Sequence, residues 1–101
     1  MTESLGIIET IGYTAAIQAA DAAVKAAKIK LGETLKVGGG KVNVVIRGDV
    51  AAVKAAVEAG VKAASRVGKV ESEVIIPRPS EKLTPAFPLD ALKKAAKKPT
   101  K

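Results

Sequence analysis

The side chains of this chain that could do chemistry are lysines and carboxylates, because its 101 residues include no histidine and no cysteine. Zinc sites, thiol nucleophiles and histidine-based catalytic triads need one of those two residue types. The sequence therefore predicts no metal ion, no disulfide and no cofactor. Any catalysis would have to use paired carboxylates or lysines alone.

Two pairs of carboxylates are the candidates for acid–base catalysis. Glu71 and Glu73 stand two residues apart in an expected strand, and the second pair is Glu9 with Glu33. Residues at spacing two share one face of a strand, and a solvated face explains Glu71 and Glu73 without catalysis. We therefore expect that the protein is not an enzyme.

The segment Gly38-Gly39-Gly40-Lys41 superficially resembles a phosphate-binding loop. A Walker loop needs two glycines separated by four residues, then Lys-Ser/Thr and a helix, whereas Val42 and an expected strand follow here. In an isolated chain, a hairpin turn that needs positive φ explains the three glycines. Several copies around one axis would instead form a ring of accessible backbone N–H and C=O groups, as in selectivity filters.

The net charge of +7 is concentrated toward the C-terminus. Residues 80–101 carry six lysines against two acidic residues, which indicates a solvated tail. Tyr13 and Phe87 are the only aromatic residues, so the stacking platforms typical of small RNA-binding domains are missing. The N-terminus lacks a signal-peptide pattern and no run reaches the ~20 apolar residues that span a bilayer. We expect a soluble cytosolic protein without nucleic-acid or membrane partners.

Hydrophobic patterning predicts four strands. The first is a short apolar run rich in β-branched residues, and the next two alternate polar and apolar residues on either side of the glycines, as in a hairpin. The fourth ends at Pro77, which cannot donate to a strand ladder. These strands are expected over residues 5–11, 29–37, 41–47 and 70–76.

Two amphipathic helices are expected between these strands. Thr14 is a candidate N-cap of the first, in which Asp21 and Lys25 form a favourable i, i+4 pair. Asp49 and Gly68 mark the two ends of the second, over residues 49–67. The faces expected to pack on the sheet are Ile17, Ala20, Val24 and Ala27 in the first helix, and Val50, Val53, Val57, Val61 and Ala64 in the second.

The order βαββαβ predicts a ferredoxin-like fold of the α/β (α+β) class, an antiparallel four-stranded sheet with two helices on one face. We expect a single domain over 1–79 and a basic tail over 80–101 that contains a short amphipathic helix at 89–98. The apolar residues include 19 alanines and 12 valines. Because such small side chains bury little area, we expect a thin monomer core.

Two features favour association between subunits. Lys25 and Lys28 lie together on the polar side of the first helix, and Arg78 is held between Pro77 and Pro79. An arginine on such a rigid segment loses little backbone entropy on contact, and arginine is enriched at protein interfaces.

Four segments carry a resemblance to a known family: LGIIET (5–10), GYTAAIQAADAAVKAAK (12–28), KVGGGKVNVVIRGDVAAVKAAVEAG (36–60) and VIIPRP (74–79). In this order and spacing they resemble the hexameric single-domain shell proteins of bacterial microcompartments, which include carboxysomes and metabolosomes. The resemblance covers nearly all of residues 4–79. It implies the βαββαβ shell fold, cyclic hexamers that tile into flat sheets, a place in a cytoplasmic microcompartment shell, and no catalytic activity.

The resemblance also implies roles for individual residues. Gly38, Gly39 and Gly40 match a central pore loop, with Gly39 at its narrowest point. Lys25 matches an edge lysine that meets its symmetry mate between hexamers, and Arg78 matches an arginine that reaches over the same junction. Lys28 adds charge beside this edge. Lys36 and Lys41 flank the loop, so a hexamer would place a ring of lysines near the opening that favours anions and polar metabolites.

The interpretation is a structural shell protein whose partners are further copies of itself, other shell proteins and, through the tail, encapsulated enzymes. Two alternatives remain open from the sequence. One is a ferredoxin-like regulatory domain that binds an anionic metabolite between subunits. The other is a basic RNA-binding protein that acts through its tail.

Overall fold

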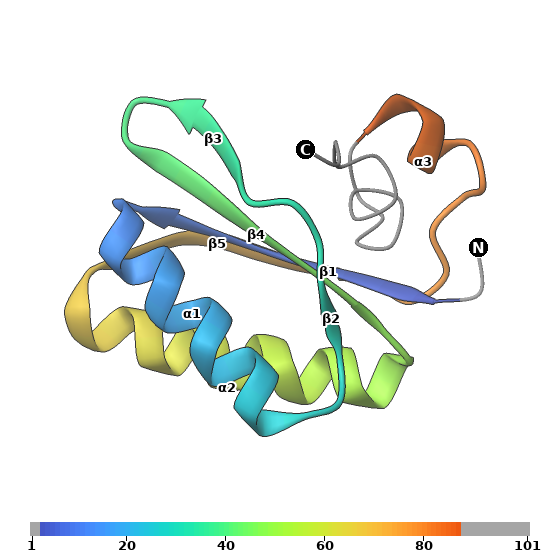
Figure 1. Cartoon of the computed structure of the whole chain (residues 1–101), viewed down its shortest axis with the longest axis horizontal. Coiled ribbons are helices and arrows are strands. Elements are labelled where there is room, and N and C mark those ends of the chain that lie inside the picture. Colours follow the sequence, from blue (N-terminus) through green and yellow to red (C-terminus); the bar gives the residue numbers. More distant parts are fainter. Residues whose placement is uncertain (1–2, 88–101) are drawn as a thin grey trace, which may run out of the picture.

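The computed structural model describes residues 3–87. α1 and α2 cover one face of the sheet and α3 lies on the other (Figure 1), which confirms the expected α+β class and the expected layer of two helices. The elements are β1 (Ser4–Ile11), α1 (Tyr13–Ala26), β2 (Lys30–Leu31), β3 (Leu35–Gly38), β4 (Lys41–Gly48), α2 (Val50–Val67), β5 (Lys69–Ile76) and α3 (Leu83–Ala86).

All strand pairs described in the sheet are antiparallel, in the order β2-β4-β1-β5, and β3 also pairs with β4. β1 lies between β4 and β5, so the first and last strands of the domain are neighbours. At one end, here called the loop end, Ile11 pairs with Lys41 and Lys69. At the other end, here called the far end, Ser4 pairs with Gly48.

The expected strand over 29–37 is two strands, which is the difference from the four-stranded prediction. Leu31 pairs with Ile46, but Leu35 pairs with Asn43, so the intervening segment holds one residue more than the facing stretch of β4. Residues directly opposite in a ladder share a sheet face. The extra residue therefore places Leu31 on the face covered by α1 and α2, and Leu35 on the opposite face. The alternating pattern had predicted that both leucines share one face.

Small side chains fill the layer between the two helices and the sheet. An ideal Cβ atom at Gly60 of α2 would lie 3.0 Å from the carbonyl oxygen of Ala19 in α1 and 2.7 Å from Cδ1 of Ile8 in β1. Glycine at this position therefore lets α2 approach both elements closely. The other small buried residues of the layer are Ala15, Ala16, Ala19 and Ala23 in α1, and Ala56 and Ala64 in α2.

The buried face of α1 is not the predicted one. Ile17 and Val24 were expected to pack inward, but they are 52% and 44% exposed while the alanine stripe faces the core. The expected Thr14 cap is also wrong, because the N-cap position is Gly12 with φ 93° and no side chain caps the helix. An alanine face allows the close approach at Gly60, which larger β-branched side chains would prevent.

α2 follows its sequence signals closely. The Asp49 carboxylate accepts a hydrogen bond from the backbone N–H of Ala52 at 3.0 Å, and the Gly68 N–H donates to the carbonyl oxygen of Ala64 at 2.9 Å. Both predicted ends are therefore confirmed. The predicted apolar face holds for Val53 and Val57, whereas Val50 is exposed.

The face of the sheet opposite α1 and α2 carries a second, smaller cluster. Leu5 and Val45 are buried there, and Leu83 of α3 packs against them. Sequence patterning did not predict α3. The helix has four residues and contributes mainly Leu83 to the cluster, so it shows no periodic apolar pattern. The expected helix at 89–98 lies outside the described residues.

Candidate functional site

The glycine loop is a two-residue turn at the tip of the β3–β4 hairpin. Gly38 pairs with Lys41, and Gly39 and Gly40 lie between them. All three glycines have positive φ, at 89°, 63° and 77°. Positive φ at both central residues is the requirement of a type I′ turn, which glycine meets without steric cost. The hairpin predicted from the sequence is therefore present.

This turn is attached to the start of α1. The backbone N–H of Gly12 donates to the carbonyl oxygen of Gly40 at 2.7 Å, and Gly12 itself has φ 93°. An added Cβ atom at Gly39 would meet nothing within 4 Å, so the tip is open to its surroundings on that side. The turn thus presents bare backbone from an anchored position.

Lys36 and Lys41 lie beside the turn, as expected, but each has a partner. The Lys36 ammonium lies 5.1 Å from the centroid of the Tyr13 ring, within range of a cation–π contact. The Lys41 ammonium is 3.9 Å from the Glu71 carboxylate, which Lys69 also approaches at 3.9 Å. These partners reduce the positive field beside the loop without removing the charges.

An open groove of about 370 Å³ adjoins the turn, and Tyr13 is the part of its wall that sequence reasoning missed. Tyr13 directly follows Gly12, and the contact of Gly12 with Gly40 that brings them to the hairpin is distant in sequence. Gly39, at the tip of the turn, is not among the residues that line this groove. The lining residues are Gly12, Tyr13, Lys36, Gly38, Gly40, Lys41 and Val42.

Each of the three candidate edge residues lies toward the far end of the molecule. α1 begins beside the loop end and its 14 residues reach about 21 Å toward the far end, where Lys25 lies in its last turn. Lys28 immediately precedes Ile29, which contacts Gly48, and Arg78 follows Ile76, which pairs with Leu5. The fold therefore separates these residues from the glycine loop by the length of the sheet.

These edge candidates are exposed and differently partnered. Lys25 forms the predicted ion pair with Asp21 at 2.8 Å, with side-chain exposures of 73% and 52%. Within residues 3–87, Lys28 and Arg78 form no ion pair. Pro79 is buried beside the exposed Arg78, and the Pro77 carbonyl oxygen accepts a 2.7 Å hydrogen bond from the Ser4 hydroxyl. Arg78 is thus held on a fixed segment.

Arg47 is a buried cation in the strand where polar residues alternate with apolar ones. Its side chain is 5% exposed, its Nε–H donates to the Ser4 carbonyl oxygen at 3.3 Å, and its Nη2 atom is 3.9 Å from the Glu3 carboxylate. Glu3 also pairs with Lys30 at 2.6 Å. The missing signal was tertiary, because no local pattern shows that the far end of the sheet closes over this position.

The carboxylates of Glu71 and Glu73, one of the pairs weighed for catalysis, have different neighbours. Glu71 is shared between two lysines, and Glu73 lies in a different groove. Glu9 accepts a 3.5 Å hydrogen bond from the Ser72 hydroxyl.

Across residues 3–87, there is no group of three or more histidine, cysteine, aspartate or glutamate side chains that could hold a metal ion. In the same part of the chain, every helix is too short or too polar to span a bilayer.

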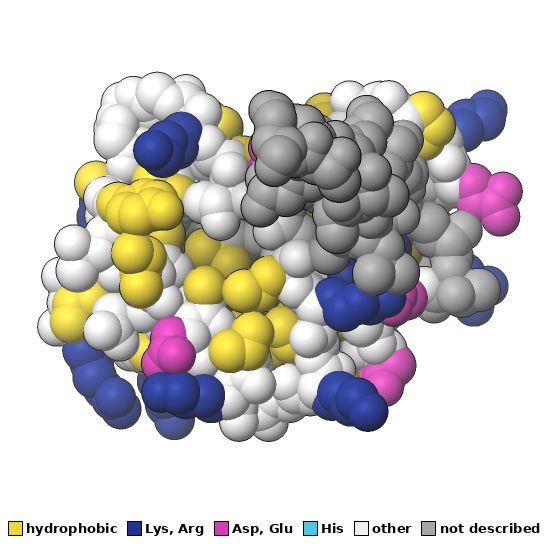
Figure 2. All heavy atoms as spheres, viewed as in Figure 1, with side chains coloured by type: hydrophobic (Ala, Val, Ile, Leu, Met, Phe, Trp, Pro, Cys, Tyr) yellow, Lys and Arg dark blue, Asp and Glu magenta, His cyan; other side chains and the backbone are white. Residues whose placement is uncertain are grey.

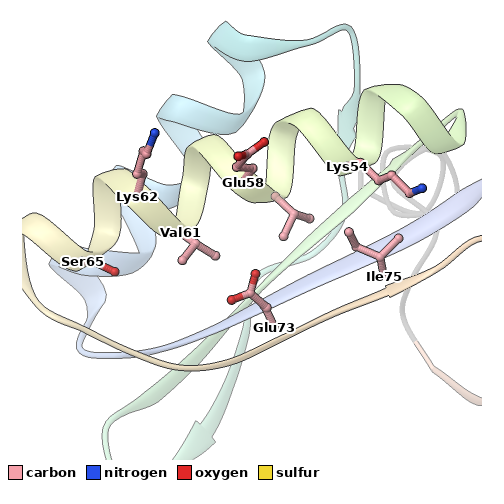
Figure 3. Close-up of a pocket in the computed structure, with 8 residues that line it drawn as sticks. Lys54, Glu58, Val61, Lys62, Ser65, Glu73 and Ile75 are labelled. Carbon is pink, nitrogen blue, oxygen red and sulfur yellow. The ribbon is translucent and has the colours of Figure 1, made fainter.

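A second open groove, also about 370 Å³, lies between α2 and β5 (Figure 3). Its floor is apolar, with Val61 pointing from α2 toward β5 and Ile75 pointing back from β5. Glu73 points into the same space from β5. Sequence analysis had assigned the valines of α2 to the core and did not predict a groove here.

Comparison with known proteins identifies the family. The family model described as the BMC domain matches residues 4–79. The chain is 51% identical over 87 residues to the bacterial microcompartment shell protein EutM of Salmonella typhimurium, which covers 86% of this chain and 91% of EutM. It is 54% identical over 86 residues to the shell protein PduA of Citrobacter freundii, covering 82% of this chain and 92% of PduA.

Carboxysome proteins and a solved structure match as well. The carboxysome shell protein CcmK2 of Synechocystis sp. is 47% identical over 91 residues, covering 88% of each chain. A microcompartment protein from Desulfitobacterium hafniense DCB superposes with a TM-score of 0.75 at 34% identity and covers all of this chain. This chain spans about half (51%) of that protein. The chain therefore belongs to the BMC-domain family of bacterial microcompartment shell proteins.

Proposed function

We propose that this shell protein forms cyclic hexamers that tile into the facets of a microcompartment, with a central pore built from the glycine loop. The observation that carries the proposal is the loop itself: three consecutive glycines at positive φ expose backbone at an anchored, open tip. A monomer needs only a turn there. Closed cyclic symmetry converts the same turn into a ring of polar backbone groups.

The pore would favour small polar or anionic metabolites. Lys36 and Lys41 supply positive charge beside the loop, Tyr13 lies against Lys36, and Glu71 offsets part of the charge of Lys41. Six copies would raise the local potential, because the charges around one axis add. The 2.7 Å hydrogen bond from Gly12 keeps the loop backbone from collapsing into the opening.

The placement of Lys25, Lys28 and Arg78 supports tiling. If the loop end faces the six-fold axis, the far end of each subunit faces outward, and these three cations lie on the outer rim. Arg78 is fixed between Pro77 and the buried Pro79, so it reaches outward at little entropic cost. The domain of residues 1–79 would then form the facet, with the tail over 80–101 available to other shell proteins or enclosed enzymes.

We further propose that the protein acts without catalysis, as a wall and filter. The related shell proteins named above are structural, and the carboxylates of residues 3–87 are dispersed or paired with lysine. Native mass spectrometry and negative-stain electron microscopy test the assembly. A species of six times the 10.3 kDa subunit mass, and extended sheets or tubes, are expected. A stable monomer at micromolar concentration would disprove the hexamer.

A further inference from the structure

The two lysines beside the glycine turn leave the hairpin from opposite faces. Val42 belongs to the core cluster between the helices and the sheet, and Lys36 lies directly opposite Val42 in the ladder. Lys36 therefore shares the face covered by α1 and α2. Lys41 precedes Val42 in β4, and successive residues of a strand point to opposite faces. The Lys41 side chain therefore starts from the other face.

The partners of the two lysines differ in charge. The Lys36 ammonium lies 5.1 Å from the ring centroid of Tyr13, and within residues 3–87 Lys36 forms no ion pair. The Lys41 ammonium is 3.9 Å from the Glu71 carboxylate. A cation against an aromatic ring keeps its full charge, whereas a neighbouring carboxylate offsets it. The uncompensated ammonium group is therefore on the face next to α1.

The groove of about 370 Å³ beside the turn, here called the hairpin groove, contains this ammonium group in its wall. The residues that line it include Tyr13 and Lys36, and none of them carries a carboxylate. In Figure 2, a basic side chain of the hairpin lies beside hydrophobic side chains at the start of α1. An anion in the hairpin groove would meet a full positive charge and, next to it, the bare backbone at Gly38 and Gly40.

Tyr13 is suited to hold Lys36 because its own position is fixed. It is the first residue of α1 and follows Gly12, whose N–H donates to the carbonyl oxygen of Gly40 at 2.7 Å. This hydrogen bond ties the start of the helix to the turn. Lysine has a flexible four-carbon stem, so the ring of Tyr13 restricts an ammonium group that would otherwise sample many positions. Tyr13 is 54% exposed, so core packing does not account for its ring.

We propose that Tyr13 is a positioning residue that seats the Lys36 ammonium at the hairpin groove, so that small carboxylate or phosphate anions collect on this face of the hairpin. The inference rests on the proposed pore and gives it two unequal sides. Six copies of Lys36, each against a tyrosine ring, attract anions more strongly than six copies of Lys41, each offset by Glu71.

The fluorescence of Tyr13 tests the charge of the hairpin groove, because the chain has no other tyrosine and no tryptophan. Iodide quenching depends on local charge and exposure, whereas quenching by neutral acrylamide depends on exposure alone. The ratio of the two, from fluorescence lifetimes at constant ionic strength, is therefore measured. Lys36→Gln is expected to lower this ratio about two-fold, the effect of one charge at this distance in physiological salt. Lys41→Gln is expected to leave the ratio near that of the wild type, as is the control Lys54→Gln on α2.

The flux of a small anion relative to that of a neutral solute of similar size, across shells or reconstituted sheets, tests Tyr13 itself. Tyr13→Leu keeps an apolar side chain without the ring and is expected to lower the flux ratio about two-fold. Tyr13→Phe keeps the ring and is expected to retain the wild-type ratio. A merely structural role of Tyr13 would change the hexamer content or the neutral flux instead.

Three results would overturn the proposal. They are an unchanged quenching ratio in Lys36→Gln, an equal decrease in Lys41→Gln, and a wild-type flux ratio in Tyr13→Leu. An unchanged flux in Gly39→Leu would instead contradict the pore. The quenching ratio does not depend on passage through a pore, so the two failures are distinguishable.

Discussion

The backbone N–H of Gly12 donates to the carbonyl oxygen of Gly40 at 2.7 Å, which joins the start of α1 to the tip of the β3–β4 hairpin. Both residues have positive φ, so neither would keep this geometry with an ordinary L side chain. Without this bond, the turn would be held only by its own two strands. The bond also connects the turn to the helix layer. Changes at the tip can therefore be separated from changes in the scaffold.

Replacement of Gly39 tests the pore. Gly39→Leu is expected to preserve hexamers and to slow the passage of anionic metabolites, because six apolar side chains at one constriction favour dewetting. The φ of 63° adds a backbone cost of roughly 1–2 kcal/mol per subunit. Flux of a small anion across shells or reconstituted sheets, normalised to hexamer content, measures the effect.

Gly39→Ser is the matched control, because it carries a similar backbone cost and keeps the tip polar. Its flux is expected to stay near that of the wild type. Normal assembly and unchanged flux in the leucine variant would show that Gly39 does not form the constriction.

Removal of the edge cations is expected to affect tiling alone. Lys25→Ala and Arg78→Ala should each leave the hexamer mass unchanged and abolish sheets in electron micrographs, because both residues lie at the far end of the sheet from the glycine loop. Lys54→Ala, on the groove rim, is a control for the loss of one surface lysine. Dissociation of the hexamer in the Arg78 variant would place that residue within the ring instead.

Gly60→Ala is expected to destabilise the subunit, although alanine is a better helix former than glycine by about 1 kcal/mol. The added methyl group would lie 2.7 Å from Cδ1 of Ile8 and 3.0 Å from the backbone oxygen of Ala19, and the backbone cannot move aside freely. We expect a net loss of roughly 1–3 kcal/mol. Thermal unfolding of both proteins at the same subunit concentration, with the oligomeric mass of each checked by native mass spectrometry, would measure it.

The control is Ala55→Gly, at an exposed position of α2. This variant measures the difference in helix propensity between alanine and glycine without a packing effect, and we expect about 1 kcal/mol of destabilisation. A Gly60→Ala variant that melts above its parent would show that α1 and α2 have room to separate.

Truncation distinguishes two parts of the C-terminal segment. Deletion of residues 88–101 is expected to leave the melting temperature within about 2 °C of the full chain, since every strand and helix described over residues 3–87 is retained. Deletion of 81–101 also removes Leu83 from the cluster of Leu5 and Val45, and should lower the melting temperature by several degrees, for a loss of roughly 1 kcal/mol. Equal melting temperatures for the two deletions would contradict a role for Leu83.

The features that sequence patterning predicted correctly are those with local causes. Asp49 and Gly68 mark helix ends through hydrogen bonds to residues three and four positions away, so the signal lies within a few residues. The glycine turn is equally local. The resemblance of the ordered segments to shell proteins supplied the family, which composition and spacing did not.

The features that patterning missed depend on contacts distant in sequence. The choice between the alanine face and the Ile17–Val24 face of α1 was decided by the close approach of Gly60, forty residues away in the chain. The buried Arg47 meets the Ser4 carbonyl oxygen and the Glu3 carboxylate, more than forty residues earlier in the chain. Hydrophobicity alone favours isoleucine over alanine for the interior. In α1 the alanine face is buried instead, because it fits against Gly60.

The alanine and glycine layer between the helices also determines how stability depends on temperature. The heat capacity change of unfolding scales with the apolar area exposed, and a layer built from Ala15, Ala19, Ala56 and Gly60 exposes little per residue. The stability curve of a single subunit should therefore be flatter than that of a domain of equal length with a leucine-rich interior. In the proposed hexamer, the surfaces buried between subunits would add to this curvature, so heat and dilution would act on the same contacts.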